Sequence, residues 1–222
     1  MSFSNNKINR IIRYFILVYL YRLVNRTFFY DGKRLSYFYH THGSWANERC
    51  VEVAIALSYL KKYDPMCILE VGNVIGMYRP VFHDVLDLYD KSIGVINEDV
   101  LSFDTSKRYS LIFSLSTIEH VGFDETIGKK LDLPSKPVDS IKNLKRLLKK
   151  DGLLLVTIPL GYRISLDKQV FDNVFGFDDC FFMKRISWSN RWVQVSKEGA
   201  KDIYYDKPFP KANGLFIGRY VK

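Results

Sequence analysis

The sequence of 222 residues lacks the spacings that a metal-stabilised or disulfide-stabilised fold requires. Its four histidines show no HExxH pattern, and its three cysteines are far apart and form no CxxC pair. An odd number of scattered thiols fits a reducing compartment better than a disulfide framework. We therefore predict a cytoplasmic protein without a metal site. The three thiols, expected to behave as small buried hydrophobic groups, belong to Cys50, Cys67 and Cys180.

A long hydrophobic run is also missing. Residues 11–21 are apolar except for Arg13, and this run is about half of the roughly 20 residues that cross a bilayer. No cleavage site of small residues follows it, as a secretory signal would require. Because residues 8–28 contain neither glycine nor proline, they predict a helix. Two positions stay open for it: docked on the core or across a homodimer, or lying as a peripheral contact at the inner face of the membrane.

Positive charge is scarce outside the N-terminal segment. The net charge is +9, of which residues 1–34 carry +6 and the other 188 residues only +3. A protein that follows a nucleic-acid backbone spreads Lys and Arg over the face that meets the polymer. The distribution therefore argues against a specific nucleic-acid partner. It also predicts two parts: a basic, aromatic helical extension over 1–34 and a globular domain over 35–222.

Beyond residue 39 the chain alternates helical and strand-like segments. The apolar spacing predicts helices over 47–62 and 140–150 and strands over 67–72, 84–89, 93–95, 109–115, 152–158, 180–186 and 215–221. Apolar strands separated by helices indicate a mostly parallel sheet covered on both faces. The last two strands have no helix of comparable length between them, which favours an antiparallel C-terminal pair. The expected fold class is therefore α/β and Rossmann-like.

Polar groups follow the ends of three predicted strands, where open α/β sheets bind ligands. A glycine-containing turn, Glu70-Val71-Gly72-Asn73-Val74-Ile75-Gly76, ends the first. Asp87 lies near the end of the second, placed to accept both hydroxyls of a ribose, and Asp99 follows the third, placed to accept an adenine amino group. The segments that connect these three predicted strands are short, and Pro80 lies in the first of these segments. The nucleotide-binding half is therefore predicted to be abbreviated.

The order of turn, acid and acid resembles the cofactor half of class I S-adenosylmethionine-dependent methyltransferases. Residues 110–122, which contain Glu119-His120, resemble the fourth-strand segment of that family, and 144–159 resemble its helix and fifth strand. The residues at 47–49 and 208–210 also resemble methyltransferase-like proteins of surface-polysaccharide gene clusters. The resemblance implies S-adenosylmethionine as cofactor. It places the cofactor-binding groups at Glu70, Gly72, Asn73, Gly76, Asp87, Asp99, Val100 and Ser114.

Glu119 and His120 are the candidate catalytic pair. A neutral imidazole can remove the proton from an acceptor hydroxyl while its oxygen attacks the methyl group. Glu119 would orient the imidazole or help to hold a cation, and a purely structural role for His120 stays open. The acceptor is expected to be a small molecule, a sugar or a lipid-linked glycan. Its candidate contacts are His42, Trp45, Asn47, Arg49 and Trp188.

Val74 departs from the family pattern, which has glycine at the middle of the turn. A side chain there is expected to crowd the methionine end of the cofactor. This departure and the short connections leave open a catalytically inactive binding or scaffold protein, and the net charge leaves open an RNA methyltransferase. A nicotinamide-dependent dehydrogenase is disfavoured, because the turn lacks GxGxxG.

Overall fold

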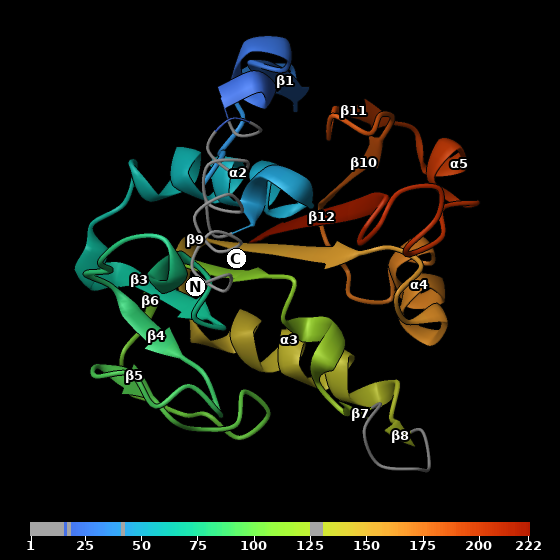
Figure 1. Cartoon of the computed structure of the whole chain (residues 1–222). Coiled ribbons are helices and arrows are strands. Elements are labelled where there is room, and N and C mark those ends of the chain that lie inside the picture. Colours follow the sequence, from blue (N-terminus) through green and yellow to red (C-terminus); the bar gives the residue numbers. More distant parts are fainter. Residues whose placement is uncertain (1–15, 17–18, 41–42, 125–130) are drawn as a thin grey trace, which may run out of the picture.

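The structure, a computed structural model, describes residue 16 and residues 19–40, 43–124 and 131–222. Its centre is an eight-stranded sheet in the order β11-β10-β12-β9-β6-β3-β4-β5 (Figure 1). The strands of this sheet are β3 (Ile68–Val71), β4 (Asp84–Leu86), β5 (Val95–Ile96), β6 (Tyr109–Leu115), β9 (Leu148–Pro159), β10 (Asp179–Arg185), β11 (Trp192–Val195) and β12 (Gly214–Val221).

The direction of the strands gives the sheet its Rossmann-like character. From β5 to β9 all neighbouring strands are parallel. The chain adds β4 and then β5 on one side of β3, and β6 and then β9 on its other side. The boundary between β3 and β6, where the direction of strand addition reverses, is therefore a topological switch point. β12 then runs antiparallel between β9 and β10. The predicted α/β class and the predicted antiparallel C-terminal pair are confirmed.

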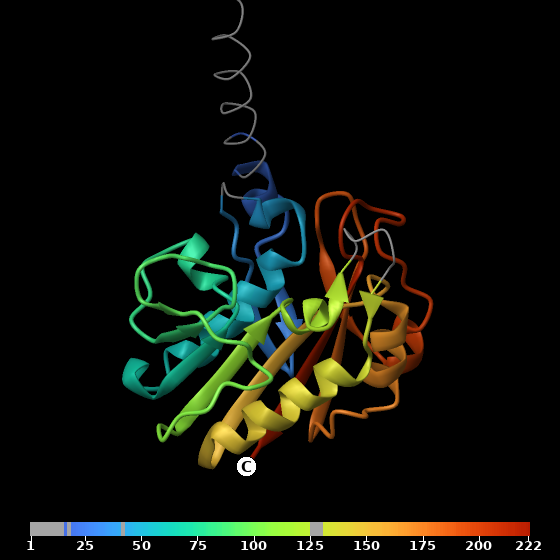
Figure 2. The same ribbon diagram turned by 90° about the horizontal axis from the view of Figure 1, so that it is seen from below.

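Each face of the sheet has its own hydrophobic core, because successive side chains of a strand point to opposite faces. Helix α2 (Arg49–Leu60) covers one face, where it packs against Leu111, Phe113 and Leu115 of β6. Helices α3 (Ser135–Leu147) and α4 (Ile164–Phe171) cover the other. Figures 1 and 2 show α2 and α3 on opposite sides of the central strands. Helices on both faces were predicted and are confirmed.

Helix α3 is shifted from its predicted range of 140–150. It begins at Ser135, since Pro137 is tolerated in the first turn of a helix, where its missing N–H has no partner to lose. It ends at Leu147, because Leu148 already pairs with Tyr109 of β6 as the first residue of β9. The remaining short elements are η1 (Ser44–Ala46), η2 (Pro65–Cys67), η3 (Ile75–Met77), η4 (Ile118–His120), β7 (Phe123–Asp124), β8 (Leu131–Asp132) and α5 (Lys197–Ala200).

A β-hairpin replaces the end of the helix predicted over 8–28. Residues 19–24 are helical, but β1 (Thr27–Tyr30) pairs antiparallel with β2 (Lys33–Ser36). Asp31 and Gly32 both have positive φ, which a two-residue hairpin turn requires. The boundary predicted between 34 and 35 thus falls inside β2. Residues 1–15 and 17–18 of the N-terminal segment lie outside the described residues.

The helical residues 19–24 are attached to the loop between β10 and β11. The Tyr21 hydroxyl donates to the Trp188 carbonyl at 3.1 Å, and Asn25 Nδ2 donates to the Ser189 carbonyl at 2.6 Å. The side chains of Tyr19, Leu20, Leu23 and Val24 are exposed. Among the described residues, no helix combines the length and the hydrophobicity that crossing a bilayer requires. Contact of this segment with a membrane surface stays a prediction.

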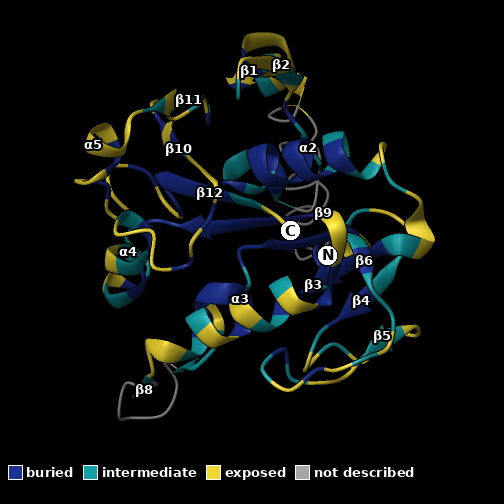
Figure 3. Ribbon diagram, turned by 180° about the vertical axis from the view of Figure 1, so that it is seen from behind, coloured by how far each residue is buried: buried dark blue, intermediate teal, exposed yellow. Residues whose placement is uncertain are grey.

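The nucleotide-binding half is abbreviated, as predicted. Residues 72–108, all of which the structure describes, contain the turn η3 but no α-helix. β4 and β5 are consequently short and joined by loops. Figure 3 shows the central strands buried and the loops around β5 largely exposed. This edge of the sheet therefore has no α-helix of its own within residues 72–108.

Candidate functional site

A cavity of about 610 Å³ opens at the carboxyl ends of β3, β4 and β6. This is the switch point of the sheet, where the strand order reverses and backbone N–H groups converge. Its volume is in the range of small-molecule binding sites. We call it the switch-point cavity. It is lined by Arg49, Val71, Gly72, Leu86, Asp87, Leu88, Tyr89, Glu98, Asp99, Val100, Leu101, Ser116, Thr117, His120, Val121, Gly122 and Phe123.

Gly72 forms the floor of the turn after β3. Its φ of +85° lies in the left-handed region, and its N–H donates to the Leu86 carbonyl at 2.8 Å. A Cβ at this position would lie 2.2 Å from Thr117 Oγ1. Both the backbone angle and the space therefore require glycine, which keeps this side of the cavity open for a ligand.

Asp87 joins the two loops that border the cavity. Its Oδ1 accepts the N–H groups of Tyr89 and Asp90, each at 2.9 Å, and its Oδ2 accepts the N–H of Asn73 at 3.2 Å. A carboxylate has about four acceptor positions, so these bonds use most of them. Asp87, a predicted cofactor contact, lines the cavity, and in the structure its carboxylate holds the two loops together. Little acceptor capacity is left for both hydroxyls of a ribose.

The loop after β5 completes this side of the cavity. Asp99 Oδ1 accepts the Leu101 N–H at 2.9 Å, and the Val100 carbonyl accepts from Asn143 of α3 at 2.9 Å. Asp99 and Val100, both predicted cofactor contacts, line the cavity. Sequence reasoning missed Leu88, Tyr89 and Leu101. Their signal was their position one or two residues after Asp87 or Asp99, where apolar side chains can cover a flat ring.

Glu70 and Ser114 are predicted cofactor contacts that do not line the switch-point cavity. Both side chains are fully buried. Glu70 Oε1 accepts the N–H groups of Val74 and Ile75, each at 2.8 Å, and Oε2 lies 2.8 Å from His83 Nε2. Ser114 Oγ donates to the Val71 carbonyl at 3.0 Å. The Glu70 carboxylate therefore fixes the backbone of the turn, because its oxygens are occupied by Val74, Ile75 and His83.

Asn73 and Gly76 also have structural roles in the turn after β3. Asn73 Nδ2 donates to Asp90 Oδ2 at 2.7 Å, and a Cβ on Gly76 would lie 2.1 Å from Asn73 Oδ1. Neither residue lines the switch-point cavity. They line a neighbouring depression of about 680 Å³, on the side of His83 and Ile93.

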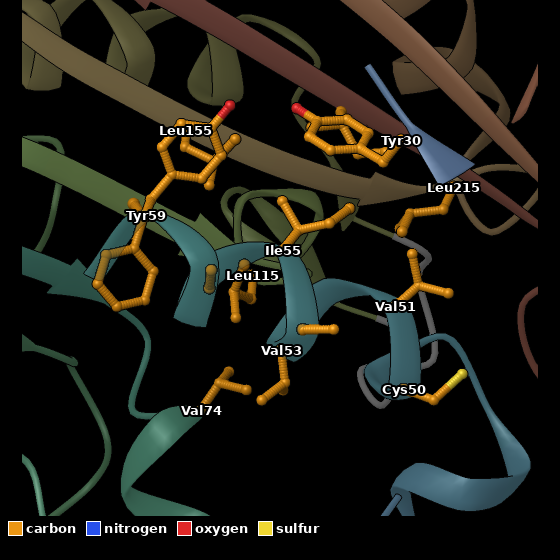
Figure 4. Close-up of a cluster of buried hydrophobic side chains, with 14 of the residues drawn as sticks. Tyr30, Cys50, Val51, Val53, Ile55, Tyr59, Val74, Leu115, Leu155 and Leu215 are labelled. Atoms are coloured by element: carbon orange, nitrogen blue, oxygen red, sulfur yellow. The ribbon is translucent and has the colours of Figure 1, made fainter. Parts of the chain in front are cut away.

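Val74 does not crowd the switch-point cavity. Its side chain is buried, with 5 % exposure, and does not line that cavity. Figure 4 shows Val74 pointing toward Val53 of α2, in the hydrophobic cluster of the α2 face. The expectation drawn from the sequence was wrong here, because the residue fills the core beneath the turn.

His120 and Glu119 lie on η4, at the opposite wall. The His120 side chain lines the cavity and is 57 % exposed, and its Nε2 lies 3.9 Å from Glu119 Oε1. Glu119 is 1 % exposed, and its Oε2 has no hydrogen-bond partner among the described residues. Burial, reinforced by the charge of Glu52, raises the pKa of the Glu119 carboxyl well above its usual range. The pair therefore combines an accessible imidazole with a carboxyl group that favours the protonated form.

Arg49 connects the cavity wall to a buried acid that the sequence analysis missed. Its Nη1 donates to Glu52 Oε2 at 3.1 Å and to the Leu115 carbonyl at 2.8 Å. Glu52 Oε1 accepts from Ser116 Oγ, and also from Thr157 Oγ1 at 2.6 Å. On a helix in the sequence, Glu52 resembles an ordinary surface residue, and only the fold reveals its burial.

The other predicted substrate residues lie away from the switch-point cavity. Trp45 stacks on Tyr21 at a centroid distance of 5.5 Å, and Asn47 Oδ1 accepts the Arg49 N–H at 3.2 Å. Trp188 is exposed and contacts the Phe209 ring edge-on at 5.2 Å. His42 lies outside the described residues. Of the predicted substrate residues, the structure therefore brings Arg49 to the cavity.

The described part of the chain contains no cluster of side chains that could serve as metal ligands. No group of three or more His, Cys, Asp or Glu side chains there is positioned to hold a metal ion. The free thiols differ in their surroundings: Cys50 is buried, Cys67 half-buried and Cys180 exposed. The expectation that all three are buried holds for Cys50 and was wrong for Cys67 and Cys180.

No profile of a known protein family matches the chain, and no functionally curated protein matches it in sequence. Among solved structures it is similar to the N-methyltransferase NodS from Bradyrhizobium japonicum bound to S-adenosyl-L-homocysteine, with 12 % identity over 79 % of this chain and 87 % of that chain and a TM-score of 0.49.

Two further similarities are of the same order. A SAM-dependent methyltransferase from Thermotoga maritima has 14 % identity over 75 % of this chain and 87 % of that chain, with a TM-score of 0.43. An rRNA methylase from Streptococcus thermophilus has 13 % identity over 77 % of this chain and 96 % of that chain, with a TM-score of 0.41. The fold of this chain is established by the strand order and the strand directions of its own sheet.

Proposed function

We propose that the protein is an S-adenosylmethionine-dependent methyltransferase whose cofactor occupies the switch-point cavity. The observation that carries this proposal is the convergence of Gly72, Asp87 and Asp99 at one cavity, from three strand ends. The resemblance of the sequence to class I methyltransferases supports it. The neighbouring structures named above are described as methyltransferases, one of them bound to the product S-adenosyl-L-homocysteine.

The charge of the cavity fits a cationic cofactor. Asp87, Glu98 and Asp99 line one side, and the cation of Arg49 is already paired with Glu52. A cleft lined by acids attracts positively charged ligands. When bound, S-adenosylmethionine supplies an activated methyl group on a positively charged sulfur. Tyr89 and Leu88 are placed to cover its adenine ring.

His120 is the proposed general base. Its imidazole lines the cavity and is more than half exposed, so it can reach an acceptor that enters from solvent. It would take the proton of the acceptor while the methyl group moves to the acceptor atom. Glu119 is the proposed partner of that imidazole. A hydroxyl of a small molecule, sugar or lipid-linked glycan stays the predicted acceptor group.

The test is calorimetric titration of the full chain with S-adenosylmethionine and S-adenosylhomocysteine. Asp87→Ala also removes the bonds that hold two loops, so Tyr89→Ala is the sharper variant. Loss of a ring stacked on a base weakens binding by about 1–3 kcal/mol, or roughly fivefold to 150-fold. Phe82→Ala is the matched control, because Phe82 is equally exposed in the same half but does not line the cavity. Absence of heat with either ligand refutes the cofactor assignment.

A further inference from the structure

The helical residues 16 and 19–24 present an apolar surface to the outside of the molecule. Five apolar side chains there are between 47 % and 69 % exposed: Ile16, Tyr19, Leu20, Leu23 and Val24. Because helical residues three or four positions apart are neighbours on one side, these five side chains form a single surface. We call this surface the outer face of the N-terminal helix. Figure 2 shows the helix, in dark blue, at the rim of the molecule.

The opposite side of the helix is the one that contacts the domain. The Tyr21 ring stacks on Trp45 at a centroid distance of 5.5 Å, and Arg22 Nη2 donates to the Tyr39 carbonyl at 2.8 Å. Asn25, directly after the helix, is buried. A surface helix of a globular domain normally buries its apolar stripe and exposes its polar side. The arrangement here is reversed, so packing within the domain does not account for the outer face.

The charge beside the outer face is positive and lacks counter-charges. Arg22, Arg26 and Arg34 are exposed, and none of them has an ion-pair partner in the part of the chain that the structure describes. Asp31 is the only acid among residues 1–36 of the sequence, and it is paired with Arg219 at 2.7 Å. The N-terminal segment therefore combines an exposed apolar surface with arginines whose charges are not neutralised.

The charge decides which partner fits this surface. An exposed apolar patch of several large side chains marks a contact with another molecule. A second copy of the chain would bring the arginines of both copies together, and like charges at short distance repel. A bilayer with anionic lipids supplies an apolar layer for the outer face and negative headgroups for the arginines. The combination therefore favours a lipid surface.

We propose that the outer face of the N-terminal helix binds the surface of a bilayer that contains anionic lipids. The helix lies in the plane of the membrane interface, with its leucine and valine side chains in the upper acyl layer. Tyr19 lies at the level of the headgroups, where amphipathic rings gather. The three arginines contact lipid phosphates. This inference goes beyond the proposed function and does not depend on a bound cofactor.

The experiment is co-sedimentation of the full chain with vesicles of two compositions. One is phosphatidylcholine alone, and the other is an equimolar mixture of phosphatidylcholine and phosphatidylglycerol. We expect binding to the mixed vesicles to be about tenfold tighter or more, because each basic residue near an anionic surface adds to the affinity. Sodium chloride should reduce this preference, since salt screens exposed charges.

Leu23→Glu tests the apolar part of the contact. It removes an apolar side chain from the outer face and adds a charge that anionic headgroups repel, and we expect about tenfold weaker binding to the mixed vesicles. Glutamate is a good helix former, so the helix itself should persist. Ile164→Glu is the matched control, because it makes the same charge change at an exposed position of α4, on the opposite face of the sheet. It should leave vesicle binding unchanged.

Arg26→Gln tests the charged part separately. We expect about fivefold weaker binding to the mixed vesicles and unchanged binding to phosphatidylcholine. Thermal unfolding shows whether each variant is folded. If Leu23→Glu does not fold, Leu20→Glu changes the same outer face and gives the same comparison.

Sedimentation velocity without lipid tests the other occupant. A dimer in solution that Leu23→Glu dissociates would assign the outer face to a second copy and overturn the proposal. Equal binding to the two kinds of vesicle would also overturn it, because the arginines would then have no part in the contact. The same holds for Leu23→Glu and Ile164→Glu variants that bind the mixed vesicles equally well, because the outer face would then not be the surface that meets the lipid.

Discussion

At the scale of single residues, Gly72 shows how tightly the turn after β3 is specified. We expect Gly72→Ala to be destabilised by the left-handed backbone, about 1–2 kcal/mol, and by overpacking against Thr117, about 1–3 kcal/mol more. Gly94→Ala is the matched control, since Gly94 has a φ of +88° but no atom within 4 Å of the added Cβ. Urea unfolding of both variants measures the difference. Equal losses of stability would mean that Thr117 moves aside freely.

The sequence predicts single residues of the site unevenly. Gly72, Asp87, Asp99 and His120 were predicted because each follows a strand whose end could be located. Glu52 could not be recognised, because an acid on an amphipathic helix usually faces solvent. Glu70 was located correctly at a strand end, but only the folded turn shows that the backbone takes up its carboxylate.

At the scale of elements, the β1–β2 hairpin joins the N-terminal segment to the α2 face. Phe28 and Phe29 are neighbours in β1 that point to opposite sides, with 3 % and 62 % exposure. We expect Phe28→Ala to lower the free energy of unfolding by about 3–5 kcal/mol, and Phe29→Ala by less than about 0.5 kcal/mol. Chemical denaturation of both variants is the measurement. Similar small effects would show that the hairpin is not part of the folding unit.

Elements were predictable from the sequence where one hydrophobic period dominated. β6, β12 and α2 were found almost at their observed ends, because their buried positions recur at the spacing of a strand or a helix. The hairpin was missed, because the apolar run before it continued a helical pattern into Thr27. The Asp31-Gly32 pair was the available signal, since this pair favours a two-residue turn between strands.

At the scale of the whole molecule, stability should be unevenly distributed over the sheet. β6 and β9 lie between two helical layers, whereas β4 and β5 end at an edge held by loops. We expect amide hydrogen exchange to be slowest in β6, β9 and β12 and faster in β4, β5 and residues 87–101. S-adenosylhomocysteine should slow exchange at 87–101 and leave α3 unchanged. Exchange at β5 as slow as at β6 would contradict this distribution.

The abbreviated half also has a kinetic consequence. The proposed cofactor contacts belong to loops: Asp87 joins the turn after β3 to the loop after β4 through three backbone bonds, and Asp99 lies in the loop after β5. No helix between β4 and β6 needs to move before the nucleotide end of a ligand leaves, since residues 87–108, all described, contain none. We therefore expect a short residence time for S-adenosylhomocysteine. Turnover would then be limited by methyl transfer rather than by product departure.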